Sequence, residues 1–295
     1  MTRVLLFFID GLGIGTRGSH NPLDGLEAAA PLAHFWGEKS EIPFDGVLVE
    51  TDPRLGVEGR PQSASGQTTI LTGINAPATV GYHKQGFPNR ALLDVINEHS
   101  IFRQLKEAGV APITFANTYT ERFFETRPRW ISATTAAVEA AGLQFNRIED
   151  LKAARAVYQD FTNQMLIERG EQVEPRTAEE AGDVLASISA NHRFTLYEYF
   201  ITDKVGHAQD REAARSVLQN LARMIRRVLA NLDLNSTVMM LTSDHGNIED
   251  LSTRSHTLNA VPTIIWGAGS QQVANRISSL ADITPAIVSL LTRDA

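Results

Sequence analysis

Continuous runs of apolar residues recur along the chain and are separated by segments of other patterns. They occupy residues 4–9, 47–49, 111–116, 196–201, 238–243 and 261–266. The longer runs lack the polar alternation of a half-exposed strand, so they are typical of strands buried on both faces of a sheet. We therefore expect each run to form a strand.

Helical spacing fills much of the chain between these runs. The clearest case is residues 210–232, where Leu218, Leu221, Ile225 and Leu229 fall on one face. Further helices are expected at residues 63–73, 91–109, 147–169 and 177–190, and a last one opens at 282–285. Strands that alternate with helices predict an α/β fold, a mostly parallel sheet sandwiched by helices.

Composition agrees with one ordinary globular domain. The chain has 295 residues, of which 43% are hydrophobic, and we expect a single domain over residues 1–295 with a possible small cap insertion at 118–180. The net charge of −7 argues against nucleic-acid binding through a basic face. Without cysteine there is no thiol nucleophile or thiolate metal site.

The apolar N-terminus reaches Asp10 too soon for a signal sequence or a membrane span. We expect a cytoplasmic protein with no membrane partner, and the sequence carries no signal for an oligomeric state.

Ligand-type side chains follow three of the predicted strands. Asp10 ends the first run, Asp203 and His207 follow the run at 196–201, and Asp244 and His245 follow the run at 238–243. His256 lies eleven residues further on. Parallel strands bring their carboxyl ends to one edge of the sheet, where ligands bind in open α/β folds. Carboxylate oxygen and imidazole nitrogen together suit divalent zinc or manganese. The pattern predicts a metal site at this edge, with Asp203 and His207 on either side of a turn that contains Gly206.

Several of these stretches, taken as an ordered set, resemble the alkaline phosphatase superfamily. They are Phe8-Ile9-Asp10-Gly11, the Ser63 helix closing on Gly73, Asp203-x-x-x-His207, Asp244-His245-Gly246-Asn247 and Ser255-His256-Thr257. The closest branch is that of the cofactor-independent phosphoglycerate mutases and phosphopentomutases, which are metalloenzymes. The resemblance covers roughly residues 1–80 and 195–295.

The resemblance implies two divalent metal ions, Zn²⁺ or Mn²⁺. One would be held by Asp203, His207 and His256, and the other by Asp10, Asp244 and His245 with the Ser63 oxygen as a further ligand. It also implies that Ser63 is the catalytic nucleophile and forms a phosphoserine intermediate, with Ser65 as the alternative. Without the resemblance, a serine near a helix start is an ordinary N-cap.

The function that follows is two-metal phosphoryl transfer on a small phosphorylated substrate. The segment between Ser63 and Asp203 is short for the large inserted domain of the mutases, which favours a phosphoester hydrolase (a phosphatase or phosphodiesterase). A phosphomutase acting on a small metabolite is the alternative, and a non-catalytic metal-binding relic is the second alternative. Arg122, Arg127, Arg129 and Lys84 are either anion-binding residues or solvated surface charges. Ser63 lacks the Pro-x-Arg pattern of sulfatases.

Overall fold

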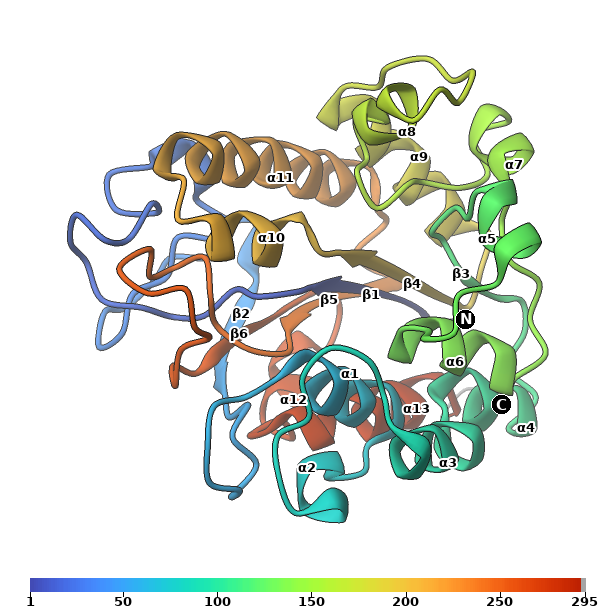
Figure 1. Ribbon diagram of the computed structural model, residues 1–295, viewed down its shortest axis with the longest axis horizontal. Coiled ribbons are helices and arrows are strands. Elements are labelled where there is room, and N and C mark those ends of the chain that lie inside the picture. The colour runs from blue at the N-terminus through green and yellow to red at the C-terminus, as the bar shows by residue number, and fades with distance from the viewer. Residues whose placement is uncertain (293–295) are drawn as a thin grey trace.

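A single six-stranded sheet lies at the centre of the structure, a computed structural model that describes residues 1–292 (Figure 1). The strand order is β2-β6-β5-β1-β4-β3. The strands are β1 (Arg3–Ile9), β2 (Val47–Thr51), β3 (Ile113–Phe115), β4 (Phe194–Tyr199), β5 (Thr237–Ser243) and β6 (Val261–Trp266). Strands β5, β1, β4 and β3 pair in parallel, while β6 runs antiparallel to β5 and β2. The mostly parallel sheet is thus confirmed.

Helices cover both faces of the sheet (Figure 1). Above it in the figure lie α8 (Gln164–Glu168), α9 (Ala178–Ala190), α10 (Ile201–Ala208) and α11 (Arg211–Asn231). Below it lie α1 (Ser63–Thr72), α2 (Ala76–Val80), α3 (Arg90–His99), α4 (Ile101–Glu107), α6 (Ala133–Ala140), α12 (Ser270–Ala274) and α13 (Ile283–Thr292). The remaining short helices are α5 (Glu121–Thr126), α7 (Ile148–Lys152), η1 (Glu27–Ala29), η2 (Pro43–Asp45) and η3 (Leu280–Asp282).

The central strand β1 explains why its sequence has no polar alternation. Leu5, Phe7 and Ile9 belong to the core shared with α9 and α11, and Val4, Leu6 and Phe8 belong to the core shared with α1 and α13. Each fully buried side chain of this size contributes roughly 1.5–3 kcal/mol. The strand is therefore held from both sides, and its end is a firm base for Asp10.

Three expected elements differ from the observed ones. The run at 196–201 ends as a strand at Tyr199, and Ile201 already begins α10. The helix expected at 91–109 is broken at the buried Ser100, whose hydroxyl donates to the Ala137 carbonyl at 2.8 Å. The helix expected at 147–169 is only α7 and α8, with a loop between them in which Ala154 adopts a positive φ. The helices expected at 177–190 and 210–232 are confirmed as α9 and α11.

Residues 118–180 contain α5 to α8 and a small apolar cluster of their own, formed by Ile148, Leu151, Tyr158 and Leu166. An isolated bridge between Asn117 and Val157 joins the segment to the residue before it, and a second bridge, between Thr118 and Asn146, lies within the segment. That it acts as a cap, and that the whole chain is one domain, stay predictions. None of the helices within residues 1–292 has both the length and the apolar character to cross a membrane.

Candidate metal centre

The carboxyl ends of three neighbouring strands bring the ligand-type side chains together. Asp10 follows β1, Asp244 follows β5, and Asp203 lies in α10, directly after β4. The backbone of Asp10 still pairs with β4, since its N–H donates to the Tyr199 carbonyl at 2.9 Å. The parallel order β5-β1-β4 therefore places residues from distant parts of the chain at one edge of the sheet.

Asp10, Asp244 and His245 form the first group. The Nε2 atom of His245 lies 3.2 Å from Oδ1 of Asp10 and 3.6 Å from Oδ2 of Asp244. One ligand atom from each residue lies within 4.8 Å of the other two. Ser63 begins α1, and its Oγ lies 2.9 Å from the same nitrogen. The structure thus brings the Ser63 hydroxyl next to this group.

Asp203, His207 and His256 form the second group. Nε2 of His256 lies 3.5 Å from Oδ1 of Asp203, and Nε2 of His207 lies 3.3 Å from Oδ2 of Asp203 and 3.2 Å from Nε2 of His256. The expected turn between Asp203 and His207 is wrong. Both lie on helix α10, where a spacing of four residues puts them on one face.

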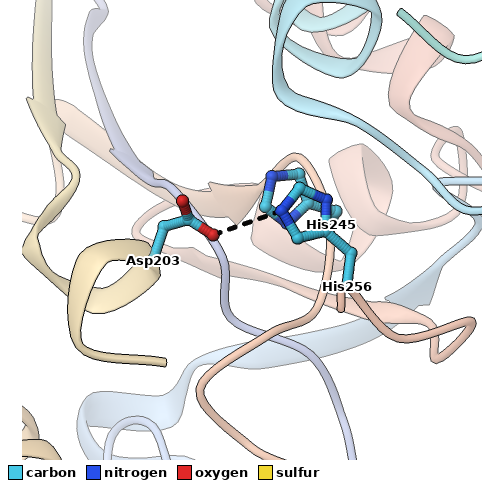
Figure 2. Close-up of side chains that lie close together, drawn as sticks. All are labelled: Asp203, His245 and His256. Carbon is cyan, nitrogen blue, oxygen red and sulfur yellow. Dashed lines mark ion pairs between the residues drawn. The ribbon is translucent and has the colours of Figure 1, made fainter. Parts of the chain in front are cut away.

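His245 lies between the two groups. Figure 2 shows Asp203 facing the overlapping rings of His245 and His256. These rings stack with centroids 3.6 Å apart and an interplanar angle of 13°. Asp203, His245 and His256 also form a set whose ligand atoms lie within 4.8 Å of one another. His245 can thus serve either group, whereas the resemblance implied a place in one group alone.

Burial of several carboxylates in one place perturbs the acid–base properties of the site. Burial and the charge of Asp10 raise the pKa of Asp244 well above its usual range. Burial alone would lower the pKa of His245, but the carboxylates of Asp244 and Asp10 raise it to about 10. Burial would raise the pKa of Asp203, but His256, His245 and Asn247 lower it to about 2. The site therefore attracts positive charge strongly.

The donor set fits a divalent cation. Within residues 1–292, Oδ1 of Asp10 is a buried oxygen without a hydrogen-bond partner, although an imidazole nitrogen lies 3.2 Å away. Carboxylate oxygens and imidazole nitrogens are the ligands that zinc and manganese accept. We conclude that these residues are suited to hold metal.

The start of α1 distinguishes Ser63 from the alternatives. Gln62 is the N-cap, and its side chain makes no capping bond. Ser65 is buried, and its hydroxyl accepts from the Lys84 N–H at 3.1 Å and donates to the Gln62 carbonyl at 3.2 Å. The Ser65 hydroxyl is thus bonded to the backbone, while the Ser63 hydroxyl lies beside the ligand-type side chain of His245. Thr68 and Thr69 bond to backbone carbonyls inside the helix.

Three polar residues around the site were missed in the sequence. The side-chain amide of Gln67 donates to Asp10 at 3.0 Å and to Asp244 at 3.3 Å. Asn247 donates to Oδ1 of Asp203 at 2.6 Å. Glu249 is fully buried and accepts from four groups: the N–H of Gly13 and of Asn247, the Thr257 hydroxyl and the Asn259 amide. Gln67 could have been found from its position one turn after Ser63, but no local pattern marks Glu249 as buried.

The cations considered for anion binding do not join this cluster. Arg122, Arg127 and Arg129 are exposed. Arg127 pairs with Glu139 at 2.8 Å, and the Arg129 guanidinium lies over the Trp130 ring. The Lys84 ammonium donates to the Gln85 carbonyl at 2.6 Å. They remain candidates for substrate contact only at the surface.

The sheet, its covering helices and the cluster at its edge define an α/β protein with a candidate metal centre at the carboxyl ends of its parallel strands. The chain belongs to the Metalloenzyme superfamily, whose family model matches residues 133–295. A 2,3-bisphosphoglycerate-independent phosphoglycerate mutase of Dinoroseobacter shibae is 34% identical over 123 residues, which cover 39% of this chain and 24% of that relative. The chain thus matches only about a quarter of the length of such curated relatives.

Solved structures match the fold along almost the entire chain. The alkaline phosphatase from the Antarctic bacterium TAB5 aligns with a TM-score of 0.51 and 14% identity, covering 99% of this chain and 98% of that one. The PH0037 protein from Pyrococcus horikoshii aligns with a TM-score of 0.58 and 13% identity, covering 99% and 98%. These likenesses show that the fold is alkaline-phosphatase-like.

Proposed function

We propose that this protein is a metal-dependent phosphoryl-transfer enzyme that hydrolyses a small phosphorylated substrate through Ser63. The observation that carries the proposal is the Ser63 hydroxyl, which lies at the first residue of α1 and 2.9 Å from Nε2 of His245. A serine at this place has ligand-type side chains beside it and a helix N-terminus behind it. That is the environment in which a weak nucleophile becomes reactive.

Two cations would be held by the residues of the two groups. Asp10, Asp244 and His245 would hold one cation, and Asp203 and His256 the other, with His245 able to contribute to both. His207, which lies 3.3 Å from Asp203 and 3.2 Å from His256, would join the second set. Divalent cations bound there would lower the pKa of an adjacent hydroxyl group and offset negative charge on phosphoryl oxygens. Zn²⁺ and Mn²⁺ both suit this donor set.

Ser63 would act in two steps. Its Oγ loses its proton and attacks phosphorus, so that an Oγ–P bond forms while the bond from phosphorus to the alcohol oxygen breaks, and the alcohol leaves after its oxygen takes up a proton from solvent. Water then loses a proton and attacks the phosphoserine, the Oγ–P bond breaks, and Oγ takes up a proton as phosphate is released. The positive end of the α1 dipole favours the negative charge gathered at Ser63 in both steps. Gln67, which bonds Asp10 and Asp244, would keep the two carboxylates in place.

A phosphomutase is the second candidate, and the match to phosphoglycerate mutases favours it. A mutase must retain the dephosphorylated substrate between its two transfers, which calls for cations that grip it. The arginines at 122, 127 and 129 are exposed, and Arg127 already pairs with Glu139. We therefore favour hydrolysis. A metal-binding relic without catalysis is the third candidate, and the complete ligand set with its serine argues against it.

The test is phosphate release from p-nitrophenyl phosphate and its bis-ester by protein loaded with Mn²⁺ or Zn²⁺. Ser63→Ala is expected to lose on the order of 10³-fold in kcat or more. It should also lose the acid-stable phosphoserine that wild-type protein forms with labelled substrate. Ser65→Ala is the matched control, since its hydroxyl bonds only the backbone, and it should keep most activity.

Each other outcome points to a different candidate. Full activity in Ser63→Ala would exclude this nucleophile. Isomerisation of a phosphoglycerate without phosphate release would establish the mutase. Two bound ions with neither reaction would leave the relic.

A further inference from the structure

A cavity with aromatic walls lies beside the metal centre, and the phosphoryl-transfer steps above do not use it. Its volume is about 650 Å³, within the range of small-molecule pockets. Phe87, Tyr119, Phe123, Trp130 and Phe200 contribute its aromatic walls. The walls come from the loop before α3, from α5 and its flanking residues, and from the end of β4.

Three connections place this cavity next to the metal centre. Phe200 directly precedes α10, the helix that carries Asp203 and His207. The loop that supplies Phe87 is tied to the start of α1, because Ser65 and Lys84 exchange two hydrogen bonds of 3.1 and 3.2 Å. Glu198 on the cavity wall is the register partner of Phe8, two residues before Asp10. A molecule bound at Ser63 therefore has this cavity as a neighbour.

The cavity presents apolar surface to solvent together with buried polar groups. Phe87 is 48% exposed and Trp130 is 55% exposed, which is unusual for side chains of this size. Thr118 is 2% exposed and lines the same cavity, yet its hydroxyl oxygen has no hydrogen-bond partner in the part of the chain that the structure describes. A buried hydroxyl without a partner costs free energy unless a ligand or water satisfies it. The Glu198 carboxyl group lies on the same wall.

Other polar groups of the wall are already engaged. The Tyr119 hydroxyl lies 2.8 Å from the Thr135 hydroxyl, and the Asn117 amide bonds the Glu198 backbone at 2.8 and 2.9 Å. Thr118 and Glu198 are buried groups of the wall that these bonds leave available to a ligand, and the Arg169 guanidinium, which donates to the Tyr158 hydroxyl at 3.2 Å, lines the wall as well. A short acyl chain would leave the aromatic faces uncovered, and a plain hydrocarbon ring would leave the Thr118 hydroxyl unsatisfied.

We propose that this cavity binds a planar heteroaromatic group on the alcohol side of the phosphoester substrate, as in a nucleoside phosphate. The inference rests on the proposed function for the orientation of the substrate, since the phosphoryl group must reach Ser63. The ring would lie against Trp130 and Phe87, and its polar edge would meet Thr118 and Glu198. The cavity would then select substrates by the alcohol that they release.

Binding without turnover tests the cavity separately from the chemistry. Adenosine, which has no phosphate, is titrated calorimetrically into the Ser63→Ala protein, with ribose as the non-aromatic comparison. Adenosine is expected to bind and ribose is not. Trp130→Ala and Phe87→Ala should each weaken adenosine binding by about tenfold, the usual effect of losing one stacking ring. Trp36→Ala is the matched control, since Trp36 is 68% exposed and lies outside the cavity.

Thr118→Val separates a ligand contact from a structural role. Valine has nearly the same shape and removes a buried hydroxyl without a partner, so the variant should fold at least as stably as wild type and still bind adenosine more weakly. Absence of adenosine binding would overturn the proposal, as would binding that Trp130→Ala and Thr118→Val leave unchanged. Tighter binding of 1-naphthol than adenosine would overturn the heteroaromatic assignment.

The two proposals fail independently. If Ser63→Ala kept its turnover, the nucleophile would be wrong while the adenosine titration still decided the cavity. If adenosine failed to bind but Ser63→Ala abolished turnover, the chemistry would stand without the cavity. Where both hold, kcat/KM for adenosine 5′-monophosphate should exceed that for glycerol phosphate, and Trp130→Ala should reduce the ratio by about tenfold.

Discussion

Glu198 is a carboxyl group held at the buried end of β4, and it should make stability depend on pH. Burial raises its pKa from 4.5 to about 7, and the nearby charge of Asp10 acts in the same direction. An acid whose pKa is raised by folding contributes stability below its unfolded pKa. That stability is lost as pH rises through the folded pKa. In metal-free protein, the free energy of unfolding of wild type should fall by about 3 kcal/mol between about pH 4.5 and about pH 7, and Glu198→Gln should abolish this fall.

Urea unfolding of both proteins with a chelator, at about pH 5 and about pH 8, measures this difference. At the higher pH the Gln variant should be the more stable protein. An equal loss of unfolding free energy in wild type and variant would show that the Glu198 carboxyl group is not strained by its burial.

Glu249 is a second residue with a large expected effect and no contact with the predicted ligands. Its two oxygens accept four hydrogen bonds that join the loop after β1 to the loop after β5. A Cβ on Gly13 or Gly246 would overlap its carboxylate, so the loops close tightly around it. Glu249→Gln replaces one acceptor by a donor that faces other donors. We expect metal affinity to fall about 10–100-fold while the protein remains folded.

Calorimetric titration with Mn²⁺ measures the affinity. Glu125→Gln is the matched control, since Glu125 is exposed on α5. An unchanged affinity in the Glu249 variant would mean that the loops hold their positions without this carboxylate.

At the level of single residues, the sequence predicts the ligand-type side chains better than the residues that hold the surrounding loops in place. Asp10, Asp244 and His245 stand out because they follow apolar runs directly. Glu249 does not, because Asn-Ile-Glu-Asp reads as an ordinary polar turn and its burial depends on a loop more than 200 residues away in sequence. The position of His245 between the two groups could not be predicted from the sequence either, since it depends on ring stacking with His256.

At the level of elements, both helices of the site carry a glycine where they approach a site residue. In α1, a Cβ on Gly66 would lie 3.0 Å from the Asp244 carbonyl oxygen. In α10, a Cβ on Gly206 would lie 2.7 Å from the side chain of Asn247, which bonds Asp203. Glycine lowers helix propensity by about 1 kcal/mol relative to alanine, so close packing is the reason for its presence here.

Gly206→Ala should therefore favour helix α10 and harm the site. We expect circular dichroism to show unchanged or increased helix content, while metal affinity falls about tenfold because Asn247 is displaced from Asp203. Lys204→Ala is the matched control on an exposed position of the same helix. If both variants bind metal like wild type, the Asn247 contact is not needed to hold Asp203.

The same glycine explains why α10 was not predicted from the sequence. Its segment, Ile-Thr-Asp-Lys-Val-Gly-His-Ala, has β-branched residues at the start and glycine near the end, so it resembles a strand end followed by a turn. The strands β1 and β6 were predictable because their apolar runs are continuous, and the helix α11 because its apolar face extends over 21 residues. Short helices such as α7, α8 and α10 depend on their neighbours instead.

For the whole molecule, the metal centre should link cation binding to the stability of the fold. Its ligands come from α10 and from the segments after β1 and β5, so a cation would hold together parts of the chain that are far apart in sequence. A ligand that binds only the folded state at 100 times its Kd stabilises it by about 3 kcal/mol. We expect Mn²⁺ or Zn²⁺ to raise the melting temperature of chelator-treated protein, and Ser63→Ala to show most of the same rise.

The effect of Asp244→Asn on stability should depend on whether a cation is bound. Without a cation, burial and the charge of Asp10 raise the pKa of Asp244 well above its usual range, so its ionised form is costly and the neutral amide should leave the metal-free protein as stable as wild type or more so. With a cation, the variant lacks a ligand and should gain little stability. In thermal unfolding, Asp244→Asn should therefore have the higher or equal melting temperature with chelator, and wild type should have the higher one with Mn²⁺.

The control is Asp94→Asn, at an exposed ion pair on α3, which should show no such reversal. If Asp244→Asn were less stable than wild type by the same margin in both conditions, Asp244 would be a structural carboxylate and not a metal ligand.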